Sequence, residues 1–311
     1  MDEMIRLGDE VAAAVADGDP VVALESTIFS GLGLPSPANA ECLRRCQAAI
    51  RAGGAVPALT AVVDGVGVVG VDLGEGPELD RVLAGSDKVA ARDLPHALAS
   101  RVGVGVTTVS ASVTLAAVAG VPVFATGGIG GVHRGAELTG DISHDLTALA
   151  RHPVVTVSAG AKAFLDLGRT LEHLETLGVP VVGWKTTRFP AFYVRDSGFP
   201  VPATVESGTD VAAMLAVARR LGHPGGVLVA NPVPAAAELD PDRIQEALAA
   251  GLAEVHARGL RGPAVTPVVL AAIAEATDGD SIPANLALAE SNAGVAAEIA
   301  VAVAEAGPVR A

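Results

Sequence analysis

The chain has 311 residues, of which 50% are hydrophobic and 18% charged, the composition of an ordinary soluble globular enzyme. The formal net charge of -14 argues against nucleic acid as a partner, because nucleic-acid-binding proteins present a basic face. No apolar run of about 18 residues predicts a membrane span, so no membrane partner and a cytoplasmic location are expected. No linker or break in composition divides the sequence, which favours one domain over residues 1–311.

The N-terminal segment predicts a helix, a strand and then a polar side chain. Residues 1–18 carry early acidic residues among Ala and Val, which favours an amphipathic helix over a signal peptide. The apolar run at 21–24 predicts a strand, and Glu25 follows it directly. Burial there would raise the pKa of the carboxyl group and suit it to donate a proton. A hydrogen-bonded carboxylate at a strand end is the alternative.

Helical periodicity over residues 37–52 places Cys42 and Cys46 on one face, in poor geometry for a disulfide. With no third cysteine and no nearby pair of histidines, these thiols fall short of a metal site. We expect both to be buried and free.

Short apolar runs alternate with helical segments along the remaining chain. This alternation predicts an α/β fold: one large domain with a mainly parallel central sheet flanked by helices on both faces, an α/β/α sandwich. Ligand sites in such sheets collect at the C-terminal ends of the strands. The predicted strands are 21–24, 61–69, 121–125, 154–157, 179–183 and 226–230, and the predicted helices are 37–52, 107–119, 163–177, 208–221 and 241–258, with further helices from about 266.

Glycines crowd the segment after the strand predicted at 121–125. TGGIGGVHRG places five glycines between Gly127 and Gly135, so backbone amides can approach an anion, and His133 with Arg134 could add donors. The run does not fit the GxGxxG pattern of dinucleotide-binding proteins, and a tight turn explains the glycines equally well.

Three oxygen-bearing residues alternate in the next segment, GDISHDL. Asp141, Ser143 and Asp145 offer the oxygen ligands that Mg²⁺ or Mn²⁺ prefers. Ser143 could instead simply cap the helix that follows.

Lys162 is one of only three lysines among 21 basic residues. It lies between VVTVSAGA and AFL, an apolar setting that would desolvate the ammonium and favour the neutral amine as a nucleophile. A lysine that extends to solvent from a strand end is the alternative. With Glu25, Lys88, Asp145 and Asn285, it gives the polar groups of a site for a sugar phosphate, with an amine nucleophile and a separate acid.

These residues lie in sequence blocks. In content and order, the blocks resemble those of the pseudouridine-5'-phosphate glycosidases, also called the indigoidine synthase A-like family. No single block decides the matter, but their joint order makes coincidence implausible. The blocks are ALESTIFSG at 23–31, KVAARDLP at 88–95, TTV at 107–109, FATGGIGGVHRGAE at 124–137, GDISHDL at 140–146, SAGAKAFLDLGRTLEHLETLGVP at 158–180, FPAFY at 189–193 and ANPVP at 230–234.

The resemblance implies a lyase-type glycosidase of pseudouridine catabolism, which cleaves the C–C glycosidic bond of pseudouridine 5'-phosphate reversibly to uracil and ribose 5-phosphate. It also implies a homotrimer with one divalent cation per subunit, Mn²⁺ or else Mg²⁺. Glu25 would be the proton donor that opens the ribose ring, Lys162 the nucleophile that forms an imine at C1', and Asp141 the metal ligand. The residues implied to contact substrate are Lys88, Val109 through its backbone, Thr126, His133, Ser143, His144, Asp145 and Asn285.

The chain departs from the family pattern at two places. Family members usually continue ESTI with two residues and then His-Gly-Met/Leu-Pro, whereas ESTIFSGLGLP lacks that His and is one residue longer. His144 stands where a small residue is common and would crowd the substrate-binding run. Two other functions stay open: another Schiff-base phosphosugar lyase or aldolase, which would share Lys162, and a catalytically silent phosphosugar-binding protein, which would tolerate the loss of Glu25 and Lys162.

Overall fold

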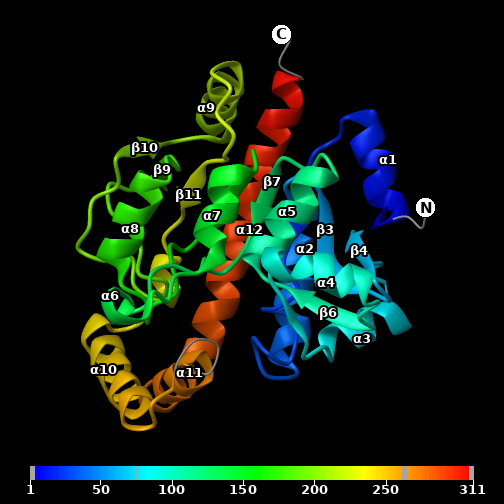
Figure 1. Ribbon diagram of the computed structural model, residues 1–311. Helices are drawn as coiled ribbons and strands as arrows, with labels where there is room; N and C mark the ends of the chain where they lie inside the picture. The colour runs from blue at the N-terminus through cyan, green and yellow to red at the C-terminus, as the bar shows by residue number, and fades with distance from the viewer. Residues whose placement is uncertain (1–3, 75, 261–264, 308–311) are drawn as a thin grey trace.

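A computed structural model describes residues 4–74, 76–260 and 265–307 (Figure 1). Its strands join in one sheet in the order β1-β4-β3-β2-β7-β8-β11-β9-β10, with β6 pairing with both β3 and β5. The strands are β1 (Ile5–Leu7), β2 (Val21–Leu24), β3 (Val56–Val63), β4 (Val66–Val69), β5 (Lys88–Val89), β6 (Val104–Thr107), β7 (Val123–Ala125), β8 (Val155–Ser158), β9 (Val181–Trp184), β10 (Ala203–Val205) and β11 (Leu228–Ala230).

Every neighbouring pair from β3 through β10 in this order runs parallel. Strand β3 pairs antiparallel with β4 and β6. The mainly parallel α/β architecture expected from the sequence is therefore confirmed. A single cluster of buried hydrophobic side chains runs through the described residues.

Helices cover both faces of the sheet. Helices α2, α9 and α12 lie together on one face, and α5, α7 and α8 lie on the other, as Figure 1 shows. The helices are α1 (Asp9–Asp17), α2 (Ala38–Ala52), α3 (Pro77–Leu83), α4 (Leu94–Ala99), α5 (Val109–Val118), α6 (Ala136–Thr139), α7 (His144–Arg151), α8 (Leu167–Thr176), α9 (Gly208–Arg220), α10 (Pro241–Ala257), α11 (Val265–Ala276) and α12 (Ser281–Ala306), with 3-10 turns η1 (Ala91–Asp93) and η2 (Ala235–Ala237).

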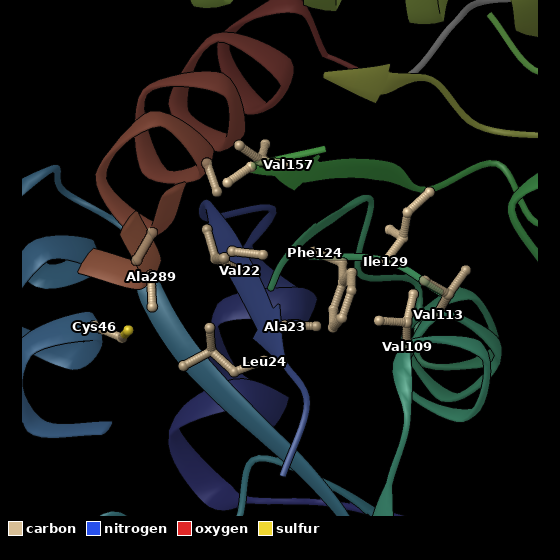
Figure 2. Packing of buried hydrophobic residues seen from close by; sticks show 14 of the residues in the cluster. Val22, Ala23, Leu24, Cys46, Val109, Val113, Phe124, Ile129, Val157 and Ala289 are labelled. Carbon is tan, nitrogen blue, oxygen red and sulfur yellow. The ribbon is translucent and has the colours of Figure 1, made fainter. Parts of the chain in front are cut away.

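Strand β2 lies at the centre of this sandwich. Val22 and Leu24 point toward Cys46 of α2 and Ala289 of α12, whereas Ala23 points toward Phe124 (Figure 2). Alternation of side chains along the strand therefore supplies apolar contacts to both layers. Burial on both faces explains why the sequence of β2 is uniformly apolar rather than alternating.

Helix α12 is long and apolar enough to span a membrane by length and composition alone, yet 61% of the relevant window is buried inside the fold. It packs against β2, β7 and β8 and against α2. The buried residues of α12 are mostly alanines, which let the helix approach the sheet closely. It is therefore the core helix of this sandwich.

The structure corrects several sequence-based boundaries. Residues 61–69 were predicted as one strand but form the hairpin of β3 and β4, because Asp64 and Gly65 adopt positive φ angles of 51° and 80°. An Asp-Gly pair is the usual loop of such a hairpin. The N-terminal helix begins only at Asp9, after the edge strand β1, whereas residues 1–3 lie outside the described residues. Short strands β5, β6 and β10 were not predicted. Cys42 and Cys46 are buried and free, as expected.

Candidate active site

A cavity of about 310 Å³ opens at the C-terminal ends of β2, β7 and β8. This is the edge of the sheet where parallel α/β folds bind ligands. Four of the polar residues predicted from the sequence, namely Glu25, Lys88, Lys162 and Asn285, line it together. The other lining residues are Thr27, Ile28, Leu32, Gly33, Ser86, Gly128, Ala163, Phe164, Phe192, Tyr193, Leu270 and Ile273.

Glu25 lies at the floor of the cavity, one residue beyond β2, and only 4% of its surface is exposed. The hydroxyl group of Thr126 donates a hydrogen bond to Glu25 Oε1. Burial raises the pKa of the Glu25 carboxyl group, and the positive charge of Lys162 opposes this shift. The raised pKa keeps a proton on Glu25 at higher pH than on an ordinary glutamate, as a proton donor requires.

Two lysines face Glu25 across the cavity. Burial lowers the pKa of Lys88, and the positive charge of Lys162 lowers it further. Lys162 follows the left-handed Gly160, and its N–H donates to the carbonyl group of Ile129 at 3.0 Å. This hydrogen bond fixes the backbone of Lys162, and the Lys162 residue forms part of the cavity wall. An amine, a carboxylic acid and a second cation therefore share one enclosed space.

Asp145 is buried, with 6% of its surface exposed, and both of its carboxylate oxygens accept backbone hydrogen bonds. Oδ1 accepts from the N–H of Ser110 at 2.9 Å, and Oδ2 accepts from the N–H of Gly130 at 2.9 Å. The carboxylate thereby joins the start of α5 to the glycine-rich turn. Because a Cβ atom at Gly130 would lie 2.7 Å from Asp145 Oδ2, only glycine permits this approach.

The three polar residues of the DISHD segment do not converge on one point. Ser143 caps α7, where its hydroxyl accepts the N–H of Asp145 at 3.2 Å, so the capping interpretation is confirmed. Asp145 is occupied by backbone donors, whereas the Asp141 side chain is 32% exposed. His144, the first residue of α7, is half-buried.

Asp141 is the predicted metal ligand, and His133 Nδ1 lies 3.8 Å from its Oδ2. Among the residues that the structure describes, no three His, Cys, Asp or Glu side chains gather closely enough to hold a metal ion. Burial lowers the pKa of His133, and the charge of Asp141 opposes the shift. A single carboxylate fits a hard cation that keeps several waters and takes further oxygens from a substrate.

The far wall of the cavity combines aromatic rings with one amide. Asn285, in the second turn of α12, has a buried Oδ1 with no hydrogen-bond partner among the described residues. Burial raises the pKa of Tyr193, and the side chain of Asn285 opposes the shift. Phe192 has a φ of 66° and meets Tyr193 edge-on, with ring centroids 4.7 Å apart. A residue other than glycine in this conformation is strained, which is frequent at binding sites.

The segment that departs from the family pattern contributes directly to the cavity. Ile28, Leu32 and Gly33 of ESTIFSGLGLP line its wall. Backbone hydrogen bonds fold the segment into successive turns. One of them runs from the N–H of Leu34 to the carbonyl group of Ile28 at 3.1 Å. This part of the wall is therefore mostly apolar, and it lies next to the space that a ligand would fill.

A family model for indigoidine synthase A-like proteins matches residues 10–302.

The chain belongs to this family.

Curated relatives of this family cover almost the whole chain. The pseudouridine-5'-phosphate glycosidase of Chloroflexus aurantiacus is 48% identical over 310 residues, which cover 98% of this chain and 100% of that protein. The protein of the same name from Methylobacterium nodulans is 49% identical, over 96% of this chain and 88% of that protein.

Solved structures show the same fold. The prealnumycin C-glycosynthase AlnA, crystallised with ribulose 5-phosphate, has a TM-score of 0.90 and 36% identity, covering 98% of this chain and 99% of that chain. An indigoidine synthase A-like protein from Thermotoga maritima has a TM-score of 0.85 and 36% identity, covering 97% of each chain. The resemblance seen in the sequence is thus confirmed along nearly the full length.

Sequence reasoning missed most of the apolar wall. Phe192 and Tyr193 belong to the FPAFY block, but nothing in their spacing indicated that they face Lys162. Leu270 and Ile273 of α11 are ordinary helix residues in the sequence, and only the tertiary structure brings them to the cavity. Polar groups in apolar surroundings are visible in a sequence, whereas apolar lining residues are not distinguishable from core residues.

Proposed function

We propose that this protein cleaves the C–C glycosidic bond of pseudouridine 5'-phosphate reversibly, to uracil and ribose 5-phosphate. The observation that carries the proposal is the pairing, in one cavity, of a buried carboxyl group at Glu25 with the amine of Lys162. Two relatives named pseudouridine-5'-phosphate glycosidase, at 48% and 49% identity, support it. The AlnA complex with ribulose 5-phosphate shows that a related fold binds a five-carbon sugar phosphate.

The bond to be broken explains why an amine is needed. Glycosidases with two carboxylates protonate an oxygen leaving group, and a C-glycoside has none. A primary amine can instead form an iminium at the anomeric carbon, which accepts the electrons that hold carbon to carbon. Among the described residues that line the cavity, Glu25 is the one carboxyl group, and it stands with the amines of Lys88 and Lys162 rather than with a second carboxylate.

The proposed reaction begins with ring opening. Glu25 gives its proton to the ring oxygen O4' while Lys162 Nζ bonds to C1', so the C1'–O4' bond breaks and the sugar becomes linear. The nitrogen then loses a proton, and C5 of the uracil takes one up. Next, the nitrogen lone pair forms C1'=Nζ as the C1'–C5 bond breaks, with its electron pair going to uracil. Water finally adds to the iminium and releases ribose 5-phosphate together with the free amine.

Substrate orientation follows from the positions of the remaining donors. Lys88 and the start of α5 at Val109 would take the phosphate, because a helix N-terminus offers N–H groups without intrahelical partners. Thr126 orients Glu25. The family resemblance also implies sugar contacts from His133, Ser143, His144 and Asp145, which lie outside the cavity lining. The buried Oδ1 of Asn285 would accept an N–H of the base. Phosphate binding can then supply energy for ring opening.

A divalent cation, Mn²⁺ or Mg²⁺, would bind at Asp141 with waters and substrate oxygens as its other ligands. When bound, it would supply positive charge to a phosphate or hydroxyl oxygen of the substrate.

The homotrimer and the cytoplasmic location stay predictions. Light scattering after size-exclusion chromatography would give the subunit number.

The deciding experiment is uracil release from pseudouridine 5'-phosphate with Mn²⁺, comparing wild type with Lys162→Arg and Lys185→Arg. Both substitutions keep the charge and remove a primary amine, but Lys185 does not line the cavity. We expect Lys162→Arg to lose at least about 10³-fold in kcat, the order expected for loss of a covalent nucleophile, and Lys185→Arg to retain wild-type rates. Borohydride with ribose 5-phosphate should label Lys162 in the wild type.

Each alternative function has its own result. A phosphosugar aldolase would give the borohydride label without releasing uracil. A binding protein would bind ribose 5-phosphate but show neither the label nor turnover. Full activity of Lys162→Arg would exclude the mechanism proposed here.

A further inference from the structure

Four buried hydroxyl groups form a cluster beneath Glu25, and the reaction described above does not use them. Ser26, Thr60, Thr107 and Ser112 are each 0% exposed. They come from the segment after β2, from β3, from β6 and from α5, respectively. Buried hydroxyl groups cost free energy unless they are hydrogen-bonded. Their concentration beside a reactive carboxyl group therefore calls for a reason.

The cluster lies where the sheet divides. Strand β3 runs parallel to β2 up to Leu59, and it runs antiparallel to β6 from Ala61 onward. Thr60 lies between the two ladders. Its hydroxyl donates to the carbonyl group of Leu24 at 2.9 Å, and its own carbonyl group accepts from Thr107 Oγ1 at 2.9 Å. Side-chain hydroxyls thus connect β2, β3 and β6 where the main-chain ladder changes partner.

Thr107 also holds the two residues that follow Glu25. Its N–H donates to Ser26 Oγ at 2.8 Å, and its Oγ1 lies 3.0 Å from the same Ser26 Oγ and accepts from the Ser26 N–H at 3.3 Å. The carbonyl group of Thr107 accepts from the N–H and the hydroxyl of Thr27 at 3.1 and 2.7 Å. Five contacts therefore fix the backbone immediately beyond the carboxyl group.

The same residue borders Lys88. In the parallel pairing of β5 with β6, Val89 is opposite Thr107 and Lys88 is opposite Val106. The N–H of Thr108 donates to the carbonyl group of Val89 at 3.0 Å, and α5 begins at the next residue. Thr107 therefore occupies the junction between the proposed acid, the proposed phosphate lysine and the helix N-terminus.

We propose that Thr107 is a positioning residue, whose hydroxyl group fixes Ser26 and thereby aims the neighbouring Glu25 carboxyl group at the sugar opposite Lys162. The inference rests on the proposed function. Only the hydroxyl contacts depend on the side chain, because the three main-chain bonds of Thr107 survive any substitution. Displacement of a reacting group by about 1 Å can cost about 10²-fold in rate. Small displacements of the Glu25 carboxyl group would therefore lower kcat.

The test compares Thr107→Val, which keeps the shape and removes the hydroxyl, with Thr107→Ser, which keeps it. Thr156→Val is the matched control: Thr156 lies in β8, is 0% exposed, and its Oγ1 has no hydrogen-bond partner among the described residues. We expect Thr107→Val to lose about 10- to 100-fold in kcat with KM unchanged. The alkaline limb of its pH–activity profile should also move to lower pH, because water that reaches Glu25 would lower the pKa of the carboxyl group. Thr107→Ser and Thr156→Val should stay near wild type.

Folding is checked on every variant by circular dichroism and thermal unfolding. If Thr107→Val does not fold, Ser26→Ala removes the other end of the same contact and should give the same fall in kcat with KM unchanged. Wild-type kcat and an unshifted pH profile in folded Thr107→Val, or equal loss in Thr107→Ser, would overturn the inference while leaving the proposed function intact. A folded wild type that releases no uracil would remove the proposed function instead.

Discussion

Two buried carboxyl groups at the end of β2 and the start of α7 differ in their hydrogen-bond donors. Glu25 meets one hydroxyl group, from Thr126, whereas Asp145 accepts two backbone N–H groups, from Ser110 and Gly130. Burial disfavours the charged form of Glu25 and raises its pKa, and the charge of Lys162 and the Thr126 hydrogen bond oppose this shift. The comparison shows how two neighbouring acids can take different tasks: Glu25 lines the cavity and suits proton transfer, whereas Asp145 lies outside the cavity lining and joins a helix to a turn.

Among variants of these two acids and their partners, Glu25→Gln should give the largest effect on activity, a fall of about 10²- to 10⁴-fold in kcat, the range for loss of a general acid. Gln still accepts the hydrogen bond from Thr126, so the fold is retained. Uracil release measures the loss. A rate within threefold of wild type would show that another group donates the proton to the substrate. Glu25 and Asp145 would then not differ in function as described above.

The same variant should be more stable than wild type near neutral pH. The folded-state pKa of Glu25 is raised, so the native state binds more protons than the unfolded state once pH exceeds the ordinary value of the carboxyl group. Stability is then lost as pH rises toward the folded-state pKa, and Gln removes this loss. Denaturant unfolding of both proteins across pH should show the curves separating with rising pH, and parallel curves would contradict the assignment.

Asp145→Asn, in contrast to Glu25→Gln, should make the protein less stable than wild type. The amide replaces one acceptor oxygen with an NH₂ group, so one buried backbone N–H, of Ser110 or Gly130, loses its partner. We expect a decrease of about 1 to 3 kcal/mol in the free energy of unfolding, with a fall of about 10-fold or more in kcat as the start of α5 shifts. Unchanged stability would show that Asp145 does not anchor the turn.

Thr126→Val sharpens the comparison by removing the only side-chain donor to Glu25 among the described residues. The Thr126 hydrogen bond lowers the pKa of Glu25, so its removal should raise that pKa further and move the alkaline limb of kcat/KM to higher pH. A rate change of a few-fold at the optimum is expected, smaller than for loss of the acid itself. A limb that moves to lower pH would contradict the role of Thr126.

Asp141→Asn should have the smallest effect at saturating metal. Its side chain is 32% exposed, so the fold should be unaffected. The Mn²⁺ concentration for half-maximal activity should rise about 10-fold or more, because a neutral amide is a weaker ligand than a carboxylate for a hard cation. An unchanged Mn²⁺ dependence, measured by titration of the metal-free protein, would place the metal elsewhere.

The order of apolar runs was enough to predict the α/β class, because strands buried on both faces leave a plain signal in sequence. The positions of Glu25 and Lys162 were also accessible, since a charged group directly after an apolar run is unusual. The hairpin at Asp64 and Gly65 was missed although its Asp-Gly pair was visible, because the apolar flanks were read as one strand. The hydroxyl cluster at Thr107 was not accessible, since it depends on four segments meeting where the sheet divides.

Leu270, Ile273 and Asn285 line the cavity although they stand far along the chain from Lys162. During synthesis, the acid and the amine therefore emerge from the ribosome before the wall that encloses them. Helix α12, which covers β2, β7 and β8, emerges after all three of these strands. Until it docks, those strands lack part of their apolar cover, and the amine stands in an open groove. The pocket can be completed only after the chain has been made as far as Asn285.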